Sequence, residues 1–262
     1  MRTARVTAAL AILLLASPAR CGTGNAAPST QASLMFWADT MHGTLGGRLG
    51  PVSADAQIGE THDSSGGISL TVKRMRSLVL DLSASEVHTD ARVDSRADFS
   101  FHGVHFGTVV GGHLHYTMPI IEGGLRYLVL NDERGSLGVI GSIKVIRPDA
   151  TLTSGSHTAT FNQTIPIPMA GLSGQVTIAS WLTGFGTFKL LRFGVGPVKC
   201  DVDDWEAGLA AEFPREGTVK GWRAALGYRR LTIDLGAGLG QDSEVRLNTD
   251  RRGPFAEVAG RF

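Results

Sequence analysis

The sequence predicts an all-β chain that closes into an antiparallel up-and-down barrel crossing a membrane, with about ten strands and a range of eight to twelve. Three observations support this fold class. About ten segments alternate apolar and polar residues, the connections between them alternate in length, and the chain opens with an export signal. Successive side chains of a β-strand point to opposite faces, so each alternating segment has one apolar and one polar face.

The export signal comes first. Arg2 and Arg5 precede the apolar run Val6 to Ala16, a pattern typical of a signal peptide. Cleavage after Ala19 or after Ala26 is compatible with the small residues there, so we expect residues 1–26 to form the signal and the mature lead. Residues 27–262 then form a single barrel domain. No later stretch approaches the roughly 20 apolar residues of a membrane helix, so a membrane crossing has to use strands.

Ten segments show the strand pattern. In Trp205 to Phe213, for example, Trp, Ala, Leu, Ala and Phe share one parity, and Glu, Gly, Ala and Glu hold the other. The segments are Leu34 to Gly50, Gly67 to Arg74, Ser77 to Ser85, Val110 to Thr117, Gly123 to Asn131, Ala170 to Ile178, Leu182 to Leu190, Trp205 to Phe213, Trp222 to Tyr228 and Ala256 to Phe262.

Connections of two lengths separate these segments. Short ones are expected at 74–76, 118–119, 179–180 and 214–220, and long polar ones at 51–66, 86–106, 132–168, 191–204 and 236–252. Transmembrane barrels place short turns on the periplasmic side and longer loops outside, whereas a Greek-key sandwich has no reason to sort its connections. The sorting therefore favours the transmembrane barrel.

The two faces of the segments differ in chemistry. In a membrane barrel the apolar face meets lipid, with aromatic girdles near the strand ends. We expect this girdle to comprise Tyr116, Tyr127, Trp205, Phe213, Trp222 and Tyr228. The charged face is enclosed, where opposite signs must pair because an isolated enclosed charge is costly. We expect this interior network to comprise His113, His115, Arg126, Glu206, Glu212, Arg223, Arg229, Glu257 and Arg261.

With its signal peptide, the strands GGLRYLVLN (Gly123–Asn131) and GYRRLTIDL (Gly227–Leu235), and the closing GPFAEVAGRF (Gly253–Phe262), the sequence resembles the small outer-membrane β-barrel proteins of Gram-negative bacteria, the porin-like and OmpA-type barrels. The resemblance implies an outer-membrane location and contact with outer-membrane lipid and lipopolysaccharide. It also implies that the terminal Phe262 is recognised by the barrel-assembly machinery. Many barrels of this group have eight strands, so a count of ten is a departure from the pattern.

No residue set predicts catalysis, a metal centre or a cofactor. Gly-x-Ser-x-Gly is absent, and two cysteines, Cys21 and Cys200, cannot build a Cys-based metal site. Asp201, Asp203 and Asp204 are expected in a solvated external loop, since the spacing of an EF-hand is missing. With 25 Lys and Arg against 24 Asp and Glu, nothing favours a nucleic-acid partner.

We therefore expect a monomeric, non-enzymatic outer-membrane barrel with a structural, surface-interaction or narrow-pore role. Two alternatives stay open. An exported soluble, lipocalin-like barrel would point the same apolar parity inward, around an apolar ligand. A lipid-modifying enzyme with its site at the rim of the barrel is the other alternative, and the sequence offers no residue for it.

Overall fold

The computed structural model describes residues 29–49, 52–75, 77–95, 99–101, 104–106, 109–155, 157–162, 164–195, 198–214, 219–238 and 243–262. The predicted signal peptide and its two cleavage sites lie outside these residues. Within them, no helix is long and apolar enough to cross a membrane.

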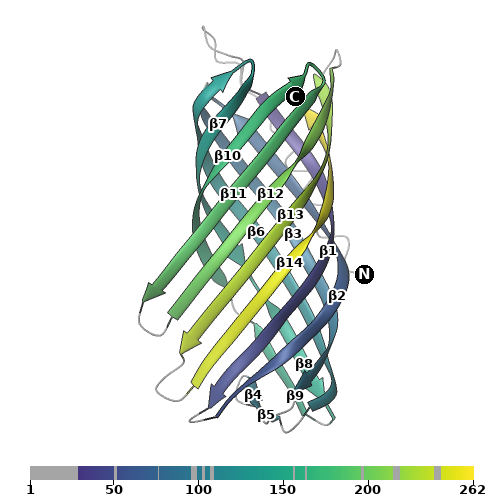
Figure 1. Cartoon of the computed structure of the whole chain (residues 1–262), viewed down its shortest axis with the longest axis vertical. Helices are drawn as coiled ribbons and strands as arrows, with labels where there is room; N and C mark the ends of the chain where they lie inside the picture. Colours follow the sequence, from purple (N-terminus) through teal and green to yellow (C-terminus); the bar gives the residue numbers. More distant parts are fainter. Residues whose placement is uncertain are drawn as a thin grey trace.

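Ten long strands close into one antiparallel barrel, in which each strand pairs with two neighbours (Figure 1). The first and last strands pair with each other from Gln31–Arg261 to Leu49–Ser243, and β3 pairs with β6. The barrel strands are β1 (Ser29–Leu49), β2 (Val52–Lys73), β3 (Leu78–Ser95), β6 (Val109–Asp132), β7 (Gly135–Ile146), β10 (Ile165–Ala179), β11 (Leu182–Val195), β12 (Val198–Pro214), β13 (Gly221–Gly238) and β14 (Ser243–Arg261).

Two hairpins are inserted at one end of the barrel, opposite the C-terminus in Figure 1. The first consists of β4 (Phe99–Phe101) and β5 (Val104–Phe106), and the second of β8 (Asp149–Ser154) and β9 (His157–Asn162). Strand β8 pairs with residues 113–117 of β6 and so continues the wall beyond the end of β7. We call this end of the barrel the collar end, and the end that holds Ser29 and Phe262 the terminal end.

The closed ten-stranded fold confirms the predicted fold class. Two expected connections are wrong, one because it lies within a strand and one because it contains a missed strand, so the number of strands is still ten. The expected turn at Met118–Pro119 lies inside β6, and β7 was missed within the loop expected at 132–168. A proline fits here because residue 119 falls where the edge of β6 changes partners. Strand β7 pairs from Ile120 and β8 from Thr117, so the missing N–H of Pro119 leaves both ladders intact.

The other expected long loops are also mostly strand. Strand β1 ends at Leu49 as expected, but β2 already begins at Val52, and β3 continues to Ser95. The strands therefore rise well past the segments that the alternation predicted. The expected connections at 74–76, 179–180 and 214–220 do fall between strands, all at the terminal end.

The outer surface of the barrel has two zones. Near the terminal end, large apolar side chains are exposed on every barrel strand except β2, where the described ones are only partly exposed, and they form the apolar belt; its members include Leu34, Phe36, Leu82, Leu125, Tyr127, Val139, Leu172, Phe188, Leu209, Leu226 and Val258. Towards the collar end the outward positions become polar, and this zone is the collar; its outward residues include His42, His62, Glu86, His88, Asp90, His115, Arg230, Asp250 and Arg252. A band of apolar side chains around a closed barrel is the surface that meets lipid.

The orientation of the faces overturns the soluble, lipocalin-like alternative. That fold would enclose Leu209 and Leu226, yet Leu226 is 69% exposed and Leu209 51% exposed. The charged parity of the same strands faces the interior, where Glu206 and Arg229 line a cavity. The hydrophobic core lies inside the barrel at the level of the collar, because most inward positions there are apolar.

Candidate functional site: the closed interior of the barrel

Five charged side chains from five strands meet near the middle of the barrel and form what we call the charge layer. They are Glu122 on β6, Lys144 on β7, Lys189 on β11, Asp204 on β12 and Arg229 on β13. Lys144 is fully buried and Asp204 is only 2% exposed. Three cations thus share two carboxylates in a largely buried cluster.

Asp204 is the centre of the charge layer. Arg229 donates to both of its carboxylate oxygens, at 2.9 Å from Nη2 and 3.2 Å from Nε. Lys144 donates to the same carboxylate, and the Nζ of Lys189 lies 3.6 Å from it. Glu122 accepts from Lys189 at 2.7 Å and lies 3.4 Å from the Nζ of Lys144. The carboxylates are therefore satisfied from several sides, which a buried charge requires.

The register of the sheet brings these residues together. Glu122 pairs with Lys144 across β6 and β7, and Lys189 pairs with Asp204 across β11 and β12. Strand β10 runs between the two pairs and places Gly171 beside Lys189. A methyl group at Gly171 would lie 2.1 Å from the carbonyl oxygen of Phe188 and 2.9 Å from the Cγ of Lys189. Glycine therefore gives the Lys189 side chain the space to reach across.

A second buried ion pair lies close to the charge layer. Arg251 on β14 contacts Asp39 on β1, and both are almost completely buried. The ring of Trp37 stands beside both groups: the guanidinium carbons of Arg229 and Arg251 are 5.3 Å and 5.2 Å from its centroid. Its Nε1 donates to the carbonyl oxygen of Gly253 at 3.2 Å. The indole thus contributes cation–π contacts to both cations and helps to seal this level.

Beyond this pair the interior is filled by apolar side chains, which we call the apolar plug. They come from most strands of the barrel wall, and all are under 4% exposed; the set is Met41, Val87, Leu114, Tyr116, Met118, Ile146, Leu152, Ile167, Val202, Leu231 and Ile233. Close-packed side chains leave no space for water between them. The charge layer and the apolar plug therefore close the barrel.

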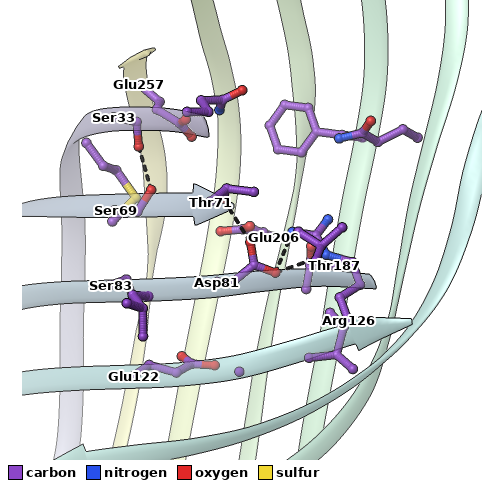
Figure 2. Close-up of a pocket in the computed structure, with 18 of the residues that line it drawn as sticks. Ser33, Ser69, Thr71, Asp81, Ser83, Glu122, Arg126, Thr187, Glu206 and Glu257 are labelled. Carbon is purple, nitrogen blue, oxygen red and sulfur yellow. Dashed lines mark hydrogen bonds and ion pairs between the residues drawn. The ribbon is translucent and has the colours of Figure 1, made fainter. Parts of the chain in front are cut away.

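On the other side of the charge layer the interior is open and polar. A cavity of about 560 Å³ extends to the terminal end, where Ser29, Lys73 and Arg261 line it. We call this cavity the vestibule. Figure 2 shows Arg126 directed at Asp81, which it contacts at 2.6 Å, while Thr71 donates to the same carboxylate at 2.8 Å. Ser33 and Ser69 share a hydrogen bond of 2.6 Å across the neighbouring strands β1 and β2.

The structure places seven of the nine predicted interior residues around the vestibule: Arg126, Glu206, Glu212, Arg223, Arg229, Glu257 and Arg261. Opposite signs pair among them and with neighbours. Arg223 lies 3.7 Å from Glu257, and Arg261 lies 3.1 Å from Glu212.

The remaining two interior predictions, His113 and His115, are wrong, as is Tyr116 in the predicted girdle. Both histidines are exposed on the outer wall, whereas Tyr116 is 3% exposed inside it. The reason is a change of environment along β6. Within the apolar belt the apolar parity faces lipid, but in the collar the outside is aqueous and the apolar parity turns inward.

The other predicted girdle residues are on the outer wall. Tyr127, Phe213, Trp222 and Tyr228 are exposed, and Trp205 packs on Tyr228 with ring centroids 5.8 Å apart. The chain end continues the pairing with β1, since the N–H of Phe262 donates to the carbonyl oxygen of Thr30 at 2.8 Å.

Sequence reasoning missed most of the charge layer. Lys144 belongs to the missed β7, and Glu122 follows the turn wrongly expected at 118–119. Asp204 was assigned to an acidic loop with Asp201 and Asp203, but all three lie on β12, where Asp204 alone of the three faces the interior. One signal was available: Asp204 shares its parity with Glu206 and Glu212, which were correctly placed inside.

The interior offers ion pairs and no metal-binding cluster among the residues that the structure describes. There, the one group of three His, Cys, Asp or Glu residues with clustered ligand atoms is His88, Asp90 and His115, on the outer wall of the collar. Cys200 is buried as a free thiol.

No protein-family model and no characterised protein sequence matches this chain significantly. Solved structures do. The outer membrane protease OmpT from Escherichia coli superposes with a TM-score of 0.59 and 10% identity, over 89% of this chain and 97% of OmpT. The translocator domain of the autotransporter NalP from Neisseria meningitidis gives a TM-score of 0.43 and 15% identity, over 90% of this chain and 88% of that domain. The chain thus has the fold of Gram-negative outer-membrane β-barrels, and its apolar belt is the surface that such a barrel turns to lipid.

Proposed function

We propose that this protein is a non-enzymatic barrel of the outer membrane that is closed to free diffusion and acts through the surface of its collar. The observation that carries the proposal is the closed interior, in which the charge layer and the apolar plug follow one another. General aqueous channels belong to barrels of about 16–18 strands, whereas narrower barrels fill their interior with side chains.

The collar supports a surface role. It continues the ten strands past the apolar belt and carries charged and polar outward residues such as Glu86, Arg230 and Arg252. In this proposal the collar faces the outside of the cell, the vestibule faces the periplasm, and lipid and lipopolysaccharide surround the belt. The barrel-assembly machinery would recognise the closing strand through Phe262, and the barrel would act as a monomer.

The likeness to OmpT raises the question of a peptidase. Hydrolysis needs a nucleophile or activated water, a base and an open site that can hold a substrate. Most described inward positions of the collar are instead apolar and buried, with Val87, Leu114 and Leu152 among them, and the polar Thr89 there donates its hydroxyl to Asp63. This composition favours a non-enzymatic barrel.

Planar-bilayer recordings test the closed interior. We expect the folded protein to give no steady single-channel current, and vesicles that contain it to swell in sugar solutions no faster than empty vesicles. A variant with Lys144→Ser and Ile146→Ser, both on the inward face of β7, should leak. Ile143→Ser, on the outward face of the same strand, should remain tight. A large, steady current through the wild-type protein would contradict the proposal.

A further inference from the structure

We propose that the outer wall of the collar carries a binding site for a divalent transition-metal ion of the zinc class, formed by His88 and Asp90 of β3 and His115 of β6. This site is separate from the closed interior, and it goes beyond the proposed function.

The three side chains form one cluster. One potential ligand atom from each lies within 4.8 Å of the others. The Nδ1 of His115 is 2.6 Å from the Oδ1 of Asp90, and the rings of His88 and His115 stand edge to face with centroids 4.9 Å apart. All three are exposed, with His115 54% and Asp90 76% exposed at the side chain, so an ion can reach them from the medium.

Strand pairing holds the cluster in place. Asp90 pairs directly with His115 across the β3–β6 ladder, and His88 pairs with Thr117. Behind them the inward side chains Val87 and Tyr116 are buried in the apolar plug. The backbone that carries the cluster is therefore part of the rigid barrel wall, and a metal ion would have to order side chains only.

Thr117 orients one of the imidazoles. Its Oγ1 lies 3.0 Å from the Nδ1 of His88 and shares a hydrogen bond with it. This leaves the Nε2 of His88 available to a metal ion. Metal-binding histidines commonly have the other ring nitrogen fixed by such a partner, which sets the tautomer and the ring orientation.

The donor set indicates the class of metal. Two imidazole nitrogens and a carboxylate suit zinc and its neighbours in the first transition series, whereas Ca²⁺ and Mg²⁺ prefer sites built from oxygen. Zinc takes nitrogen ligands at about 2.0–2.1 Å and carboxylate oxygens at about 2.0–2.2 Å, so the three donors have to close around the ion. The hydrogen bond between His115 and Asp90 opens in this step. Water or a donor from another molecule fills the fourth position.

Zinc titration of the full chain, folded in detergent, tests the site. Isothermal titration calorimetry with ZnCl₂ should detect one site in the micromolar range for the wild type. His88→Ala and His115→Ala should each weaken this site at least about tenfold. His113→Ala is the matched control: His113 lies on the same strand and the same face as His115, but outside the cluster. It should leave the affinity unchanged.

The chain has eight histidines, and the comparison separates this site from the six that lie outside it. Zinc bound elsewhere would give identical curves for the wild type and His88→Ala, and that result would overturn the proposal. So would a wild type with no saturable site, or displacement of the zinc by millimolar Mg²⁺. Heat-modifiable migration on gels establishes that each variant is folded, and Thr117→Val, which keeps all three ligands, should weaken binding less than His88→Ala.

Discussion

Replacing Asp204 by Asn tests how far the charge layer depends on its central carboxylate. Asp204 contacts Lys144, Lys189 and Arg229 and is 2% exposed. The five residues of the layer carry three positive and two negative charges, a formal sum of +1. Asp204→Asn leaves three positive charges and one negative charge, a sum of +2, in the same buried volume.

The expected cost follows from this burial. Removing one partner of a buried ion pair destabilises a protein by about 3–5 kcal/mol, because the remaining charge stays enclosed without compensation. Glu122 still contacts both lysines after the substitution. We therefore expect a loss near the lower limit, about 3 kcal/mol in the free energy of unfolding.

Asp203→Asn provides the control on the adjacent residue. Asp203 points outward, and its partner Arg192 lies 3.8 Å away with a side chain that is 72% exposed. Exposed ion pairs contribute at most about 1 kcal/mol. Urea unfolding of the protein in lipid vesicles, followed by tryptophan fluorescence, gives both free energies. Equal losses for the two variants would refute the reasoning about the charge layer.

Three further perturbations have defined outcomes in the same unfolding assay. Leu226→Arg, in the apolar belt, should lower the free energy of unfolding by about 2–4 kcal/mol, and Asn248→Arg, in the collar, by at most about 1 kcal/mol. Equal losses would contradict a lipid-facing belt. Gly171→Ala should cost about 1–3 kcal/mol because its methyl group meets Phe188 and Lys189, whereas a methyl at Gly174 on the same strand meets nothing closer than 3.9 Å, so Gly174→Ala should be neutral. In the collar, burial raises the pKa of Asp250, but the hydrogen bonds from Arg230 outweigh it and leave that pKa below its ordinary value. A carboxyl whose pKa is lower in the folded than in the unfolded protein stabilises the fold above the unfolded pKa of about 3.9, and this stabilisation is lost as the pH falls through the folded pKa. Arg230→Gln should therefore reduce the loss of stability below pH ~4. An unchanged loss would contradict this.

The sequence predicted the closed barrel because apolar and polar residues alternate along a strand wherever one face meets lipid and the other meets a polar interior. It predicted most of the charged residues that line the vestibule, though not the cavity itself, for the same reason: Arg126, Glu206, Arg223 and Glu257 lie opposite exposed apolar neighbours on their strands. Opposite signs within one enclosed face were enough to expect pairing.

The collar could not be predicted by the same rule. A strand that leaves the membrane keeps its alternation but reverses its phase, because water replaces lipid outside and the apolar side chains turn inward. On β6 this reversal separates Tyr127, exposed in the belt, from Tyr116, buried in the plug. The sequence marks no point at which the phase changes, so His115 was placed on the wrong face. The strand was divided into two because a turn was expected at Pro119.

The charge layer escaped prediction for a different reason. Its contacts join residues 60 and 67 positions apart, Lys144 with Asp204 and Glu122 with Lys189. Such pairs depend on the order and register of the whole barrel. They also depend on Gly171, whose missing side chain gives no signal in an alternating pattern.

The central claim is that the apolar belt meets lipid and the collar meets water around a barrel of the outer membrane. Single cysteines at Leu226 and at Arg252, in a Cys21→Ser, Cys200→Ser background, test it in reconstituted vesicles. A fluorophore at position 226 should be quenched by brominated lipid and be shielded from aqueous iodide. A fluorophore at position 252 should show the reverse. Quenching of both by iodide and of neither by brominated lipid would mean a water-soluble barrel and would contradict the account.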